Sequence, residues 1–114
     1  MKNDSLYKGS LQTIILKLLG ENEKMYGYEI TQKVKELTKD ELVITEGALY
    51  PALHKLEAEG LLESEHVNIG NRIRKYYKLT EKGTQETANR MAEMQQFLET
   101  IAQIFTPPLK PKFS

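Results

Sequence analysis

The chain has 114 residues, 39% hydrophobic and 28% charged, with 16 basic and 16 acidic side chains. This length suits one compact domain, or one small domain with an appendage, and excludes two catalytic domains. No apolar run approaches the roughly 20 residues that cross a bilayer, and the first residues lack the apolar stretch of a signal peptide. We therefore expect a cytoplasmic protein with no membrane partner. The absence of cysteine and the presence of two histidines exclude disulfides and zinc fingers and nearly exclude a metal enzyme, so we expect no cofactor.

Two short amphipathic helices are predicted in the first third of the chain. From Ser10 to Gly20 the apolar residues follow the i, i+3, i+4, i+7, i+8 spacing of one helix face, with Ser10 as the cap and Gly20 at the end. A second helix is predicted over positions 26–37. Its inward face is expected to comprise Ile30, Val34 and Leu37.

A third helix is predicted to begin after Thr45, which is placed to cap it, and to end at Gly60. Its apolar face is formed by leucines and an alanine, whereas the opposite face is polar and aromatic and has little that requires burial. Pro51 lies near the first turn, so we expect a kink and not a break. The residues on the polar and aromatic face are Gly47, Tyr50, Pro51, His54, Lys55 and Ala58.

A β-hairpin is predicted at positions 62–79, with its turn at 69–72. Alternation along the second strand places one of Tyr76 and Tyr77 in the core and the other outside. One register puts attractive or neutral pairs across the strands. The facing pairs in that register are Asn68 with Ile73, Glu63 with Lys78 and His66 with Lys75.

The zero net charge hides two adjacent charged stretches. Between positions 69 and 82 five basic residues stand against one acidic residue, whereas positions 57–65 hold four glutamates and no basic residue. A net charge of zero by itself argues against a strongly basic nucleic-acid-binding protein. The positive stretch falls on the hairpin and the start of the helix that follows it.

A long helix is predicted from a cap at Thr80 to about Phe105, a length of roughly 39 Å. Its apolar residues alternate in steps of three and four, as in a coiled-coil seam. The small domain can bury only the first turns of such a helix, so the stripe from Met94 onward needs a partner. A second copy is the economical partner because a two-fold dimer buries the same stripe twice. The predicted dimer interface comprises Met91, Met94, Leu98, Ile101 and Phe105.

The order helix, helix, helix, hairpin is typical of a winged helix-turn-helix, in which the third helix enters a DNA major groove and the hairpin touches the backbone beside it. The positive charge lies on the hairpin, where phosphates would supply most of the affinity, while the inserted helix reads base edges. We therefore predict a mainly α fold of the α+β class. The predicted DNA-binding residues are Thr45, Gly47, Tyr50, Pro51, His54 and Lys55 on the helix, and Asn71, Arg72, Arg74 and Lys75 on the hairpin.

Three stretches of the sequence also resemble the PadR-type transcriptional regulators, and together they cover most of positions 10–83 in order. The resemblance implies a winged helix, a dimeric DNA-binding regulator that is usually a repressor, and a last helix that serves dimerisation. The single short C-terminal helix looks like that of the smaller members of this family. The stretches are Tyr26-Gly27-Tyr28-Glu29-Ile30, then Gly47-Ala48-Leu49-Tyr50-Pro51-Ala52-Leu53 continuing through Leu56-Glu57 to Gly60-Leu61, and Arg74-Lys75-Tyr76-Tyr77-Lys78-Leu79-Thr80 with Gly83.

We expect three parts in the chain: a winged helix-turn-helix DNA-binding domain at 1–79, a C-terminal dimerisation helix at 80–106 and a Pro-containing tail at 107–114. Met91, Met94 and Phe97 could line a pocket for a small apolar or aromatic effector, as in relatives that sense phenolic acids or drugs; the alternative is that they are only dimer core. The absence of tryptophan argues against drug stacking on an indole.

Two other functional classes stay open at this point. One is a winged-helix module that binds a protein and has no specific DNA site. The other is an enzyme, which the sequence disfavours because it has no cysteine, no suitably spaced histidine and carboxylate, and no glycine-rich phosphate loop. Salt dependence separates DNA binding from an apolar protein interface, because only the former weakens steeply with salt.

Overall fold

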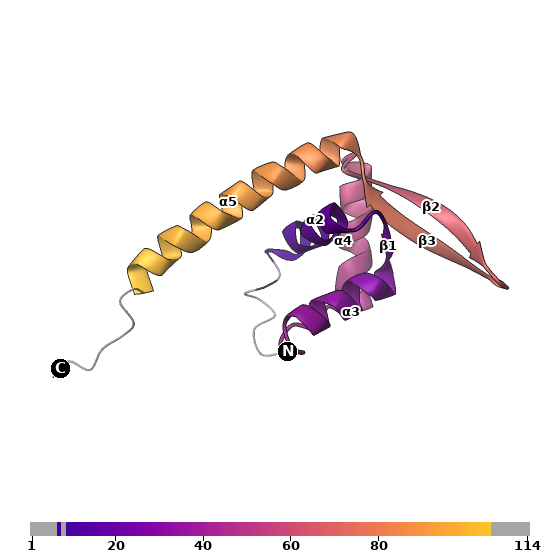
Figure 1. Ribbon diagram of the computed structural model, residues 1–114, viewed down its shortest axis with the longest axis horizontal. Coiled ribbons are helices and arrows are strands. Elements are labelled where there is room, and N and C mark those ends of the chain that lie inside the picture. The colour runs from indigo at the N-terminus through magenta and orange to yellow at the C-terminus, as the bar shows by residue number, and fades with distance from the viewer. Residues whose placement is uncertain (1–6, 8, 106–114) are drawn as a thin grey trace.

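The computed structural model describes residues 7 and 9–105, and shows a helical body, a hairpin that projects from it and a long helix that leaves it in another direction (Figure 1). The predicted tail and position 106 lie outside the described residues. None of the described helices is long and apolar enough to cross a membrane. The elements in chain order are α2 (Leu11–Glu21), β1 (Met25–Tyr26), α3 (Gly27–Leu37), α4 (Glu46–Ala58), β2 (Leu62–Ile69), β3 (Arg72–Leu79) and α5 (Glu81–Phe105).

The helices α2 and α3 confirm the first two predicted helices, with two corrections at their ends. The Ser10 side chain makes no capping hydrogen bond, and α2 continues one residue past Gly20. Leu37 was expected to point inward, but 62% of its surface is exposed. The last turn of α3 reaches the rim of an open groove between α2, α3 and α5, so no described element covers it.

The helix α4 begins and ends where local signals predicted. The hydroxyl of Thr45 accepts a hydrogen bond from the backbone N–H of Ala48 at 3.3 Å. The helix continues past Pro51 to Ala58, because the ring lies within the second turn, where few backbone hydrogen bonds are lost. The chain then reverses at Gly60, whose φ of 79° lies in the left-handed region that glycine adopts without strain.

The hairpin has the predicted register, with Asn68 opposite Ile73, Glu63 opposite Lys78 and His66 opposite Lys75. The sequence did not predict β1, which pairs with β3 to complete a three-stranded sheet of order β1-β3-β2. In this pairing Met25 lies opposite Tyr77 and Tyr26 opposite Tyr76. A strand of two residues is too short to show alternation, so only the tertiary pairing identifies it.

The core lies between α2, α4 and the inner face of the sheet. Tyr77 is 1% exposed and is the buried member of the tyrosine pair, while Tyr76 faces the other side of the sheet and is partly exposed. Leu16 is fully buried, although it lies off the predicted apolar face of its helix. It is buried because α2 packs against α4, α5 and β3 and is therefore covered on several sides.

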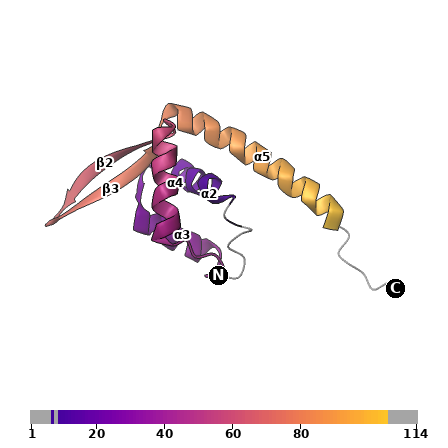
Figure 2. The same cartoon turned by 180° about the vertical axis from the view of Figure 1, so that it is seen from behind.

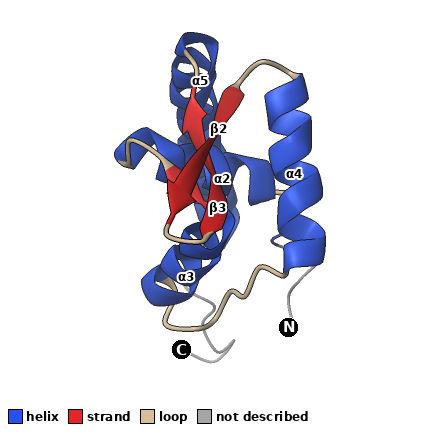
Figure 3. Cartoon of the chain, turned by 90° about the vertical axis from the view of Figure 1, so that its right-hand side faces the viewer, coloured by secondary structure: helices blue, strands red, loops and turns tan. Residues whose placement is uncertain are grey.

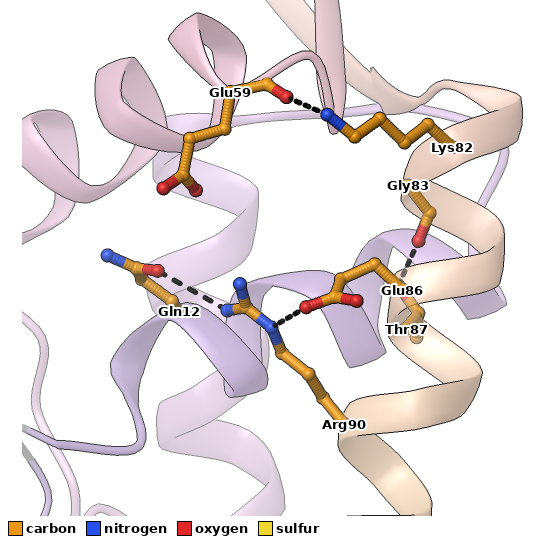
Figure 4. Close-up of polar contacts among 7 residues, drawn as sticks. All are labelled: Gln12, Glu59, Lys82, Gly83, Glu86, Thr87 and Arg90. Atoms are coloured by element: carbon orange, nitrogen blue, oxygen red, sulfur yellow. Dashed lines mark hydrogen bonds and ion pairs between the residues drawn. The ribbon is translucent and has the colours of Figure 1, made fainter.

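The helix α5 is attached to the body by its first turns and then runs clear of it (Figure 2). Thr80 caps it, since its hydroxyl accepts the Gly83 backbone N–H at 2.9 Å. Arg90 bridges the carboxylate of Glu86 at 2.8 Å and the side-chain oxygen of Gln12 on α2 at 3.3 Å (Figure 4). The hydrogen bond from Arg90 holds the pKa of Glu86 below its ordinary value.

The second half of α5 exposes an apolar stripe, as predicted. The exposed fractions are 56% for Phe97, 53% for Leu98, 71% for Ile104 and 60% for Phe105, while Ile101 is partly buried. The observed order of helices, hairpin and long helix confirms the predicted mainly α, winged helix-turn-helix fold.

Candidate nucleic-acid interface

The polar and aromatic face of α4 is exposed along its length. Leu49, Leu53 and Leu56 are fully buried and anchor the opposite face in the core, so α4 presents a fixed surface. The structure places six of the predicted DNA-binding residues on this exposed surface. They are Thr45, Gly47, Tyr50, Pro51, His54 and Lys55.

Tyr50 is held in a defined position on this face. Its ring lies over the backbone of Gly27 at the start of α3, so closely that a Cβ at position 27 would be 2.9 Å from the Tyr50 Cζ. The ring of His54 lies 6.4 Å from that of Tyr50, measured between centroids, at an angle of 45°. Tyr50 keeps 37% of its surface exposed, so it can still contact a ligand on the open side.

The hairpin divides its predicted DNA-binding residues between two faces. Figure 3 looks at the hairpin from its projecting side, with α4 beside the sheet. Asn71 and Arg72 are exposed at the turn, and Arg74 shares the outer face with Arg72 because residues alternate along β3. Lys75 lies on the opposite, inner face, where its ammonium is 3.8 Å from the carboxylate of Glu57 on α4. Alternation in the sequence could already have separated Arg74 from Lys75.

Two lysines of the hairpin, and Lys24 beside it, form ion pairs with neighbouring glutamates. Lys78 lies 3.4 Å from Glu63, and Lys24 donates to Glu65 at 2.9 Å. That hydrogen bond holds the pKa of Glu65 below its ordinary value and raises the pKa of Lys24. Lys82 donates to the carbonyl oxygen of Glu59 at 2.9 Å (Figure 4).

Arg72 and Arg74 differ from Lys24, Lys75 and Lys78, because within residues 9–105 neither arginine forms an ion pair. The guanidinium of Arg74 instead lies over the ring of Tyr26, 4.2 Å from its centroid. Tyr26 and Lys24 were missed by reasoning from the sequence, because they reach the hairpin only through the pairing of β1 with β3. The free positive charge on the outer face of the hairpin is therefore carried by the two arginines.

The residues predicted for an effector pocket are not brought together within one chain. Met91 and Met94 line an apolar groove of about 470 Å³ between α2, α3 and α5, whereas Phe97 lies beyond it. Leu98 and Phe105 of the predicted dimer interface are exposed. Among the described residues, no three histidine, aspartate or glutamate side chains are close enough to hold a metal ion.

Comparison with known proteins finds one family and two similar transcriptional regulators. The chain matches the family described as "Transcriptional regulator PadR-like family" over residues 15–89. It is 37% identical over 76 residues to "Transcriptional regulator Rv3488" of Mycobacterium tuberculosis, and the match covers 67% of each protein. A transcriptional regulator from Clostridium thermocellum has a similar structure, with a TM-score of 0.80, 31% identity, and coverage of 89% of this chain and 95% of that one.

One similar structure contains a nucleic acid. Bacillus subtilis PadR, solved in complex with operator DNA, matches with a TM-score of 0.64 and 32% identity. The match covers 71% of this chain and 46% of the Bacillus protein.

Proposed function

Since the chain belongs to the PadR-like family of transcriptional regulators, which are not enzymes, we propose that it is a homodimeric repressor that binds a palindromic operator. The observation that carries this proposal is the combination of an exposed polar face on α4 with two arginines on the hairpin that have no carboxylate partner in the described chain. The Bacillus relative in complex with operator DNA supports it. Such a regulator works in the cytoplasm, where its DNA lies.

Each element has its own part in this proposal. Tyr50, His54 and Lys55 on α4 face the major groove and read base edges, while Arg72 and Arg74 hold phosphates. Lys75 starts from an ion pair with Glu57, so it contributes less charge to the phosphates than an unpaired cation would. In this division residues 1–79 bind DNA, residues 80–106 form the dimer and the tail at 107–114 follows.

The dimer is proposed from the apolar stripe on α5 and the groove beside it. Phe97, Leu98, Ile104 and Phe105 are exposed, and a stripe of this kind needs a cover in water. The groove between α2, α3 and α5 is apolar and adjoins the stripe at Met94. A second copy related by a two-fold axis covers stripe and groove in both chains at once, and sets two α4 helices roughly 34 Å apart, one turn of DNA.

A small apolar or aromatic effector is the proposed release signal. Met91, Met94 and Phe97 are polarizable or aromatic side chains that a dimer would gather at its interface. An effector bound there acts if it prefers a dimer in which the two α4 helices are wrongly spaced for the operator.

Selection of bound sites from random duplex DNA tests the proposal. We expect a palindrome with half-sites one helical turn apart, and binding that weakens steeply between about 50 and 200 mM salt. A protein that selects no sequence, and whose partner binding hardly responds to salt, would instead be a protein-interaction module.

A further inference from the structure

Tyr26 occupies a junction between the hairpin and the helices. Its backbone pairs with Tyr76 on β3, and its N–H donates to the carboxylate of Glu29 on α3 at 3.0 Å. Its ring packs edge-on against the ring of Tyr76, with centroids 5.3 Å apart and planes at 78°. Tyr76 and Glu29 hold the backbone of Tyr26, and the ring of Tyr76 holds its ring, so the Tyr26 ring is an ordered platform on the outer face of the sheet.

Arg74 rests on this platform. Its guanidinium carbon is 4.2 Å from the centre of the Tyr26 ring, within the range of a cation–π contact. A carboxylate partner would occupy the N–H donors of the guanidinium and neutralise its charge. Glu63 neutralises the charge of Lys78 in this way. An aromatic ring face neither occupies the N–H donors of the guanidinium nor neutralises its charge, because those donors point outward in the plane of the guanidinium. Arg74 is thus held in place while its charge and its donors remain available.

We infer that Tyr26 is a positioning residue for nucleic-acid binding, which holds Arg74 ready for a phosphate of the DNA backbone. The inference rests on the proposed function. A free arginine side chain loses rotamer entropy on binding, and a side chain ordered in advance loses less. The ring of Tyr50 packs against the next residue, Gly27. The same two-residue segment therefore supports a contact of the hairpin and a contact of α4.

The experiment compares DNA affinity for variants at positions 26 and 74. Tyr26→Phe keeps the ring face and should bind like the unchanged protein, whereas Tyr26→Leu should bind about two- to fivefold more weakly. In the Arg74→Ala background, Tyr26→Leu should cause no further loss. The Arg72→Ala background is the matched control, because Arg72 lies nearer the turn, four residues before Tyr76, with which Tyr26 pairs, and there the loss should persist.

A second measurement does not depend on DNA. The Arg74 Nε–H resonance should be displaced by the ring current of Tyr26, and should return toward the position of a free arginine in Tyr26→Leu. Should Tyr26→Leu fail to fold, pentafluorophenylalanine at position 26 replaces it, since this residue keeps the shape of phenylalanine and removes the negative ring face.

The outcomes separate the inference from the proposed function. Equal losses from Tyr26→Leu with and without Arg74, or an unchanged Arg74 resonance, overturn the inference while DNA binding stands. If the protein binds no duplex DNA at low salt, the proposed function is wrong. The role of Tyr26 in DNA binding is then wrong too, even if the Arg74 resonance shows the ring contact.

Discussion

Gly27 lies directly against the ring of Tyr50, so that a Cβ at position 27 would be 2.5 Å from the Tyr50 hydroxyl oxygen. The contact joins the first residue of α3 to the exposed face of α4. Tyr50 can take this orientation toward a ligand because glycine at position 27 has no side chain.

Gly27→Ala should displace the Tyr50 ring without unfolding the protein. The two nearest atoms belong to the Tyr50 phenol, which can swing away, while the Leu49 Cδ2 at 3.3 Å must shift slightly. The helix preference of alanine over glycine offsets that shift, so we expect the free energy of unfolding to change by about 1 kcal/mol or less. DNA sequence preference should change, because Tyr50 no longer lies in its original place. In a Tyr50→Ala background the same substitution should leave DNA binding unaltered. Additive effects in the double variant would contradict a link through Tyr50.

Gly83→Ala should destabilise the fold. A Cβ at position 83 would collide with the carbonyl oxygen of Leu61, and backbone cannot swing away, so the start of α5 must move. We expect a loss of about 1–3 kcal/mol in chemical denaturation. Gly20→Ala is the matched control, because its Cβ would meet only side-chain atoms at 3.7 Å. That variant should be as stable as the parent or more so, since alanine favours a helix.

Replacing Arg72 and Arg74 by alanine should weaken binding to every DNA sequence. Each phosphate contact contributes about 0.9 to the slope of log affinity against log salt, so the slope should fall by about 2 in the double variant. The control is Lys17→Ala, which removes a positive charge on α2 that is paired with Glu21 at 2.6 Å. An unchanged salt slope in the arginine variant would mean that the hairpin is not part of the DNA interface.

Leu98→Asp combined with Ile101→Asp should yield monomers in light scattering. Burying two carboxylates without partners in an apolar interface costs far more than a small interface supplies. Gln96→Asp combined with Gln103→Asp adds the same charge to the opposite side of α5 and should leave the dimer intact. A stable dimer after the first change would place the interface elsewhere.

The ion pair of Lys24 and Glu65 should make the stability of the fold depend slightly on pH. The hydrogen bond from Lys24 lowers the pKa of Glu65 in the folded chain. The pair therefore stabilises the fold above the unfolded pKa, and this contribution is lost as the pH falls through the folded pKa. An NMR titration should show the pKa of the Glu65 carboxyl rising in Lys24→Met. Equal values in both proteins would mean that the pair does not form in solution.

Signals close together in the chain predicted most of the fold. The Thr45 and Thr80 caps each depend on a donor three residues ahead. The hairpin register follows from charges such as Glu63 and Lys78 that face each other across a short turn. These features could be predicted because the interacting groups are near neighbours whose spacing is set by helix or strand geometry.

The errors and omissions share a different origin. Leu37 lies on the predicted face of its helix, yet it is exposed because no described element extends over the last turn of α3. The strand β1 exists only because Met25 and Tyr26 meet β3. Whether a side chain is covered depends on which distant element lies above it, and periodicity carries no information about that.

The sequence by itself determined the winged helix-turn-helix order, the exposed face of α4 and the apolar stripe of α5, because each follows from periodicity and capping within one element. Only the tertiary structure decided which charges of the hairpin stay unpaired. It set Lys75 against Glu57 and Arg74 over Tyr26, by bringing together residues that the chain keeps far apart.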